Sequence, residues 1–113
     1  MIVDDPWFTH ILEGRKRVEG RKRSPTWSGV KIGDLINIQK KSQPLEQFTV
    51  QVVDLRHYTG PDPLFSYLLS EGVQQVLPDV PNLTRAIMVY LQWSTPEEIE
   101  KYGMLAIEVT RCY

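Results

Sequence analysis

The order of apolar and polar residues along the chain predicts four short strands. Apolar side chains alternate with polar ones, or form a short continuous run, in the segments 15–22, 35–39, 48–55 and 104–110. The polar residues 40–46 separate two of these segments and predict a hairpin that pairs them antiparallel. We therefore expect a largely antiparallel sheet.

Apolar residues at helical spacing predict helices between these strands. The first would start at Asp4 or Asp5, with Pro6 in its first turn, and would stop at Gly14. The expected helices cover residues 4–13, 64–71, 83–93 and 95–102, with a short further turn up to residue 77. The last of them has the clearest start, because Thr95–Glu98 matches a capping box with proline at the first helical position.

Helices that interrupt antiparallel strands indicate an α+β domain. Short strands in a chain of 113 residues tend to curl and close, because an open sheet leaves unpaired edges and one unburied face. We expect a small mixed β-barrel flanked by short helices. The length suits a single domain over residues 1–113.

Composition narrows the class of protein. A hydrophobic content of 42% is ordinary for a folded domain, and no apolar run is long enough for a transmembrane helix, so we expect no membrane association. The first residues lack the pattern of a secretory signal, and a single cysteine, Cys112, favours a reducing compartment, cytosol or nucleus. His10 and His57 have no carboxylate or cysteine at ligand spacing, so we expect neither a metal nor a cofactor.

Charge is unevenly distributed along the chain. Residues 15–41 contain nine basic and two acidic side chains and so carry +7, while the whole chain carries −1 and the remainder therefore −8. This segment is either a face that binds a polyanion or a run of solvated charges that binds nothing. The acidic segment 79–100 offers a third possibility, the docking of a basic protein partner.

The most informative cluster lies within the basic segment. Gly14, Lys16, Glu19 and Arg21 have the spacing G-x-K-x-x-E-x-R. Lysine acts as a point charge, whereas arginine offers a planar fork to a phosphate or a base carbonyl. A carboxylate between them can accept from the exocyclic amine of cytosine or adenine. The alternative is an internal ion-pair network that only fixes the strand.

This cluster resembles the signature of the ASCH domain, a branch of the PUA-like β-barrel superfamily. Three further segments match, and the resemblance covers nearly the whole chain: the turn and strand at 30–36, the helix end at 68–72 and the late strand at 102–107. The resemblance implies a β-barrel with a cleft between barrel and helices, into which the signature residues project. It also implies relatives that bind RNA or hold a modified base.

Some ASCH proteins are amidohydrolases of acetylated cytidine, and others are ribonucleases. The resemblance maps a general base onto Lys16 and a proton donor onto Glu71. The amidohydrolase members carry threonine where this chain has Glu19, and a carboxylate is a poor replacement for a hydroxyl nucleophile. Activation of water by Glu19 stays open. Ribonuclease chemistry would draw on Lys16, Glu19 and Arg21 together with a tyrosine such as Tyr58 or Tyr67.

We therefore expect RNA or nucleotide binding through a basic cleft, with hydrolysis of RNA or of a modified nucleoside as the alternative. The residues expected to contact nucleic acid are Lys16, Arg17, Glu19, Arg21, Lys22, Arg23, Trp27, Lys31 and Tyr58. Trp27 is the best stacking candidate, because it lies in a loop beside the basic run. Trp7 and Trp93 favour a packing role.

Overall fold

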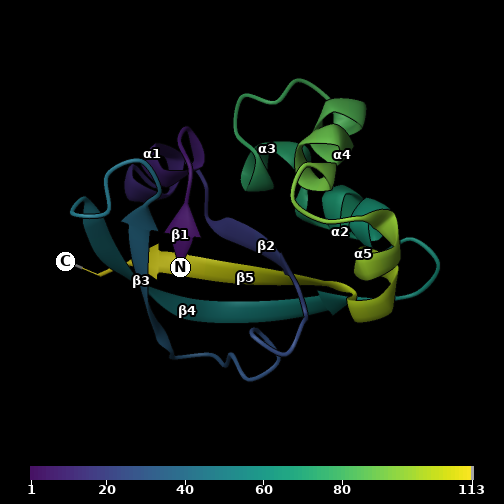
Figure 1. Cartoon of the computed structure of the whole chain (residues 1–113), viewed down its shortest axis with the longest axis horizontal. Coiled ribbons are helices and arrows are strands. Elements are labelled where there is room, and N and C mark those ends of the chain that lie inside the picture. Colours follow the sequence, from purple (N-terminus) through teal and green to yellow (C-terminus); the bar gives the residue numbers. More distant parts are fainter. Residues whose placement is uncertain (113) are drawn as a thin grey trace.

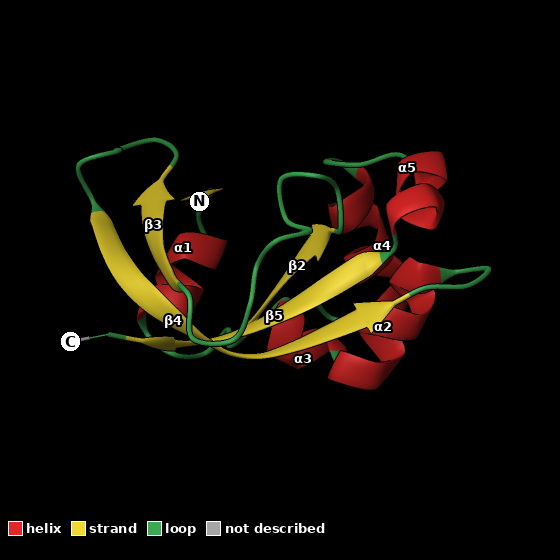
Figure 2. Ribbon diagram, turned by 90° about the horizontal axis from the view of Figure 1, so that it is seen from below, coloured by secondary structure: helices red, strands yellow, loops and turns green. Residues whose placement is uncertain are grey.

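The computed structural model describes residues 1–112, and in it five strands form one sheet that curls into a half-barrel (Figure 2). Their order across the sheet is β1-β3-β4-β5-β2. Their bounds are β1 Ile2–Val3, β2 Val18–Lys22, β3 Leu35–Lys40, β4 Gln47–Tyr58 and β5 Met104–Arg111. The α+β class and the small barrel with flanking helices are as predicted.

Strand pairing follows the expected hairpin and adds one strand. β3 and β4 pair antiparallel across the polar connection, and β5 pairs antiparallel with β4 on one side and with β2 on the other. A shift of register between Val52 and Asp54 marks a bulge in β4, which helps a sheet to bend. β1 was not predicted; its two residues are too short to show a periodicity, and it pairs parallel with β3.

Five helices lie among the described residues, in two groups (Figure 1). Their bounds are α1 Trp7–Leu12, α2 Pro63–Glu71, α3 Val73–Val76, α4 Leu83–Leu91 and α5 Pro96–Tyr102. α1 lies beside β1 and β3, whereas α2–α5 gather at the other end of the sheet. The capping box of α5 is confirmed at Thr95 and Glu98, and Asn82 caps α4. None of these helices has the length and apolar character needed to cross a bilayer.

Two predicted boundaries were wrong, each for a local reason. The strand expected from residue 15 begins only at Val18, because the backbone N–H groups of Arg15 and Lys16 both donate to the carbonyl of His10. Neither aspartate caps α1, whose N-cap is Pro6; the Asp5 carboxylate instead accepts from the backbone and hydroxyl of Thr9. Gly14, with φ of 79°, ends this region as expected.

The sheet separates two apolar clusters, and β5 contributes side chains to both. Met104 and Ala106 pack with helices α2–α5, while Leu105, Ile107 and Val109 pack with α1, β3 and β4. This explains why β5 reads as a continuous apolar run, because a strand covered on both faces has no polar side. The edge strand β2, which pairs only with β5, carries Glu19 and Arg21, and Lys16 lies just before it.

Candidate functional site

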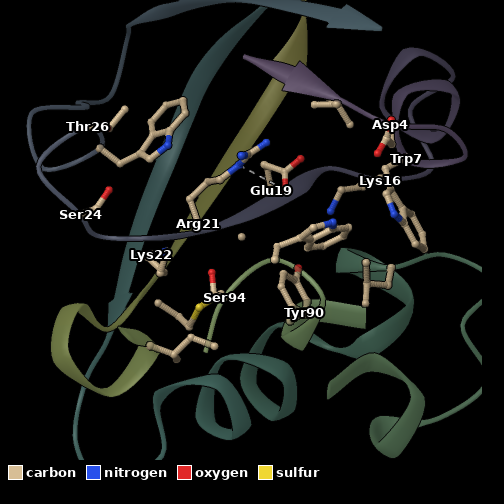
Figure 3. Close-up of a pocket in the computed structure, with 17 residues that line it drawn as sticks. Asp4, Trp7, Lys16, Glu19, Arg21, Lys22, Ser24, Thr26, Tyr90 and Ser94 are labelled. Carbon is tan, nitrogen blue, oxygen red and sulfur yellow. Dashed lines mark ion pairs between the residues drawn. The ribbon is translucent and has the colours of Figure 1, made fainter. Parts of the chain in front are cut away.

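A pocket of about 310 Å³ opens where the two groups of helices face each other across β2 (Figure 3). Its wall is assembled from the first strand and helix, from β2 and the loop after it, and from the segment joining α4 to α5. The signature residues Lys16, Glu19 and Arg21 all line it. The sequence-based expectation placed these three in a cleft between barrel and helices, and that is where they lie.

The geometry of β2 directs Glu19 and Arg21 to one face of the sheet. They lie two residues apart, and their cross-strand partners are Ile107 and Leu105, which belong to the barrel-side cluster. The side chain of Glu19 is only 10% exposed. No group within residues 1–112 donates a hydrogen bond to its carboxylate, and the nearest cation, Arg21 Nε, is 3.9 Å away. The carboxylate oxygens keep contact with solvent, so their hydrogen bonds come from water or from a ligand in the pocket.

Arg21 is also incompletely satisfied. Its guanidinium lies 5.9 Å from the ring centroid of Trp27, and one terminal nitrogen is 3.4 Å from the carbonyl of Ile2. Its Nε is buried without a hydrogen-bond partner in the described part of the chain. Figure 3 shows the side chain between Glu19 and the loop that carries Ser24 and Thr26. Its Nη1 forms no hydrogen bond within residues 1–112 and is not buried, so the guanidinium keeps donor capacity.

Lys16 is buried almost completely, at 2% exposure. Its ammonium donates to the carbonyl of Val18, at 2.7 Å, and to that of Val76 at the end of α3. Burial lowers the pKa of Lys16; the charge of Glu19 opposes this effect and that of Arg21 adds to it. Lys16 thus ties β2 to the helical end of the molecule while presenting its amine to the pocket.

The opposite face of β2 is packed by two tyrosines. The hydroxyls of Tyr67 and Tyr90 are 2.7 Å apart, and both side chains are buried. Burial raises the pKa of each phenol above its ordinary value, and the negative charge of Glu19 acts in the same direction. Both therefore stay protonated at neutral pH. Tyr90 also lines the pocket.

All three tryptophans of the chain line the pocket. Trp27 was singled out in the sequence, but Trp7 and Trp93 were assigned to packing. Trp7 does pack against both apolar clusters, yet it also borders the cavity, and Trp93 is 49% exposed. Helical spacing could not reveal this, since the three residues come from segments far apart in sequence. An exposed tryptophan bordering a cavity is the signal for a stacking surface.

Two residues expected at the site lie elsewhere. Glu71 and Tyr58 do not line the pocket, and the Tyr58 hydroxyl donates to the Glu71 carboxylate. Arg56 donates two hydrogen bonds of 2.7 Å to the same carboxylate. These bonds lower the pKa of Glu71 despite its burial. A carboxyl group held ionised by an arginine is a poor proton donor, and the structure does not bring it to Lys16 and Glu19.

The basic segment is largely neutralised by folding. Six of its nine basic residues form an ion pair with a carboxylate: Arg15, Arg21, Lys22, Lys31, Lys40 and Lys41. Lys31 is bound to Asp34 at 3.2 Å, away from the pocket. Arg17 and Arg23 line other hollows of the surface. The structure thus offers a mostly apolar, aromatic pocket with a few charged groups rather than a continuous basic face.

Metal chemistry receives no support from the side chains. Within residues 1–112, no three histidine, cysteine, aspartate or glutamate side chains gather as metal ligands would. His10 is buried and engaged, because its Nδ1 accepts from Arg15 at 2.8 Å and its Nε2 is 3.4 Å from Asp79.

Comparisons with known proteins identify the family and agree with the fold. The family model of the ASCH domain matches residues 1–112. The crystal structure of hypothetical protein PH0355 is similar, with 28% identity and a TM-score of 0.84 over 99% of this chain and 96% of that one. The solution structure of protein PF0455 from Pyrococcus furiosus has 27% identity and a TM-score of 0.73 over 98% and 97% of the two chains. A comparison with curated proteins gave no match.

Proposed function

The chain belongs to the ASCH domain family, and we propose that its pocket binds the base of one nucleotide, either free or in single-stranded RNA. The family is generally associated with RNA binding. A cavity of about 310 Å³ lies at the lower end of the range for small-molecule sites. That size suits one base with its ribose, with any further RNA outside the pocket.

The observation that carries this proposal is the state of Glu19. Its side chain is nine-tenths buried and lines the pocket, and its carboxylate, which keeps contact with solvent, receives no hydrogen bond from the described residues. A ligand that supplies N–H donors would satisfy it, and the exocyclic amines of cytosine and adenine do so. Uracil offers a single N–H flanked by two carbonyl oxygens, which a carboxylate would repel.

The tryptophans supply the remaining part of a base site. Trp7, Trp27 and Trp93 reach the cavity from three different segments. Stacking of a base on an aromatic ring is worth roughly 1–3 kcal/mol, and it tolerates any base. Stacking therefore provides affinity, while Glu19 provides the choice among bases.

Replacing Glu19 by glutamine is expected to weaken binding of cytidine and adenosine by about 10- to 100-fold, because a hydrogen bond to a charged group contributes about 1.5–3 kcal/mol. The variant should bind uridine no worse than the wild type does. Quenching of tryptophan fluorescence reports binding directly, since all three tryptophans border the pocket. Calorimetric titration gives the same constants independently.

The matched control is Glu100→Gln, which makes the same chemical change on the exposed surface of α5. It should leave affinity for all nucleosides unchanged. Equal binding of cytidine to wild type and Glu19→Gln, with both folded, would overturn the proposal.

A second candidate function, hydrolysis, is favoured by the state of Lys16. Burial lowers its pKa, which increases the fraction of neutral amine. A neutral amine that donates its two N–H groups to Val18 and Val76 has its lone pair in the remaining direction. Lys16 would then act as a general base, with Glu19 activating a water molecule.

Incubation with N4-acetylcytidine and with labelled single-stranded RNA tests this second function. If either is cleaved, Lys16→Met should abolish turnover, and the wild-type rate should rise with pH through a midpoint below 10.5, the ordinary pKa of lysine. The rate rises with pH because only the deprotonated amine of Lys16 can accept a proton. Turnover that survives in a folded Lys16→Met protein would exclude this mechanism.

A further inference from the structure

The pocket has two chemically different ends. Lys16, Trp7 and Asp4 lie at one end and Ser24, Thr26 and Lys22 at the other, with Glu19 and Arg21 between them (Figure 3). We propose that the second end holds a phosphate group, so that the ligand is a nucleotide and not a free nucleoside or base. This inference rests on the base-binding function proposed above.

Arg21 supplies the strongest reason. Its Nη1 forms no hydrogen bond within residues 1–112 and, unlike the buried Nε, keeps contact with solvent. Its ion pair with Glu19 is long at 3.9 Å, and its one hydrogen bond, to a backbone carbonyl, is 3.4 Å. A guanidinium that is satisfied within a fold forms short, paired bonds, as Arg56 does with Glu71 at 2.7 Å. Arg21 lacks such a partner, and phosphate oxygens match the fork of donors that it offers.

Hydroxyl groups extend this donor set. The side chains of Ser24 and Thr26 line the pocket beside Arg21, and neither hydroxyl has a hydrogen-bond partner within residues 1–112. Hydroxyl and guanidinium donors together are the usual contacts of phosphate oxygens. Lys22 borders the same end of the pocket, but its ammonium forms an ion pair with Glu98 at 2.8 Å. Glu98 therefore partly neutralises the charge that Lys22 could offer to a phosphate.

Glu19 decides where the anion lies. A phosphate near its carboxylate would be repelled, whereas the amine edge of a base is attracted. The base therefore belongs on the Glu19 side and the phosphate on the loop side of Arg21. The ribose spans the distance between them, which accounts for a single pocket that contains both a carboxylate and an unsatisfied arginine.

The test compares cytidine with cytidine 5′-monophosphate, cytidine 3′-monophosphate and the dinucleotide CpC at fixed ionic strength. At least one phosphorylated ligand should bind tenfold or more tightly than cytidine. If only a monophosphate binds more tightly than cytidine, the pocket takes a terminal phosphate. If CpC gains as much affinity, the pocket takes a phosphodiester of RNA. Either result supports the inference.

Arg21→Gln should remove most of that gain while changing cytidine affinity less than threefold. Arg85→Gln, which removes an exposed arginine from α4, should leave all affinities unchanged and so controls for net charge. Thr26→Val alters the exposed loop alone and should reduce the gain even if Arg21→Gln fails to fold.

Two outcomes would contradict the phosphate inference, and they differ in what they imply for base binding. Equal affinity for cytidine and all its phosphorylated forms overturns the phosphate site and leaves base binding standing. Absence of binding for every ligand overturns both this inference and the proposed function.

Discussion

Gly20→Ala is expected to destabilise the domain by about 3 kcal/mol or more, and to leave much of it unfolded at physiological temperature. A methyl group built at this position would lie 2.3 Å from the hydroxyl oxygen of Tyr67 and 2.6 Å from its Cζ atom. It would also lie 2.9 Å from the hydroxyl oxygen of Tyr90. Both rings are buried among the helices, so neither can move aside without disrupting its neighbours.

Denaturant unfolding followed by circular dichroism measures this effect. The control is Gly29→Ala, because no atom lies within 4 Å of the added methyl there and the loop is exposed. Its free energy of unfolding should remain within about 0.5 kcal/mol of the wild-type value. Tyr67→Phe should rescue Gly20→Ala only in part, since the ring carbon remains in the way. A Gly20→Ala protein as stable as the wild type would show that the two rings yield easily.

Arg56→Leu is expected to cost about 3 kcal/mol of unfolding free energy at pH 7. The substitution leaves the carboxylate of Glu71, which is 6% exposed, without its cation. Asp54 and Glu108 also lose their bonds to the guanidinium, at 2.7 Å and 3.0 Å, and the three acidic groups then repel one another. The estimate lies at the low end for a broken ion pair, because Arg56 is 32% exposed.

The effect of Arg56→Leu should depend on pH in a defined direction. In the wild type the hydrogen bonds of Arg56 lower the pKa of Glu71 below 4.5, so their contribution is present above that pH and is lost as pH falls through the folded value. In the variant, burial raises the pKa of Glu71, and protonation relieves the unpaired charge. The difference in stability between the two proteins should therefore shrink between pH 7 and pH 4.

Glu71→Gln in the Arg56→Leu background should recover part of the loss at pH 7, because the buried charge is gone. Arg85→Leu removes an exposed arginine from α4 and should be nearly neutral. A pH-independent deficit in Arg56→Leu would mean that lost packing of the arginine stem, and not the carboxylates, causes the change.

These two experiments probe how the fold holds the site. β2 carries Glu19 and Arg21 toward the pocket on one face and meets two tyrosines on the other. Only a residue without a side chain can lie between Glu19 and Arg21 and still admit the Tyr67–Tyr90 pair. The arginine that the fold needs, Arg56, is bonded to three carboxylates, whereas Nη1 of Arg21 forms no hydrogen bond within residues 1–112 and stays accessible to a ligand.

Much of the architecture could be predicted because it depends on local patterns. The capping box at Thr95, the hairpin between β3 and β4, and the glycine that ends the α1 region are each set by a few adjacent residues. The family and its barrel could be predicted from one motif, since Lys16, Glu19 and Arg21 occur on a single strand and its approach. Strand β1 could not be predicted in this way, because its two residues are too few to show an alternation.

Interactions between distant segments could not be predicted in the same way. The positive charge of residues 15–41 was evident in the sequence, but its pairing with Glu98, Asp5 and other carboxylates exists only after folding. Glu71 was expected to act together with Lys16 for the same lack of long-range information. In the structure its carboxylate instead accepts two hydrogen bonds from Arg56 on β4.

By itself, the sequence determined most of the elements, the barrel class and the importance of Lys16, Glu19 and Arg21, because hydrophobic periodicity and a motif within eight residues are local properties. Only the tertiary structure decided which of those charges stay unsatisfied. It brought Trp7, Trp27 and Trp93 to one cavity, placed the carboxylate of Glu19 there without a protein donor, and left Nε of Arg21 without an acceptor. Burial and partnership depend on what the rest of the chain places beside a residue, and no spacing along the sequence encodes that directly.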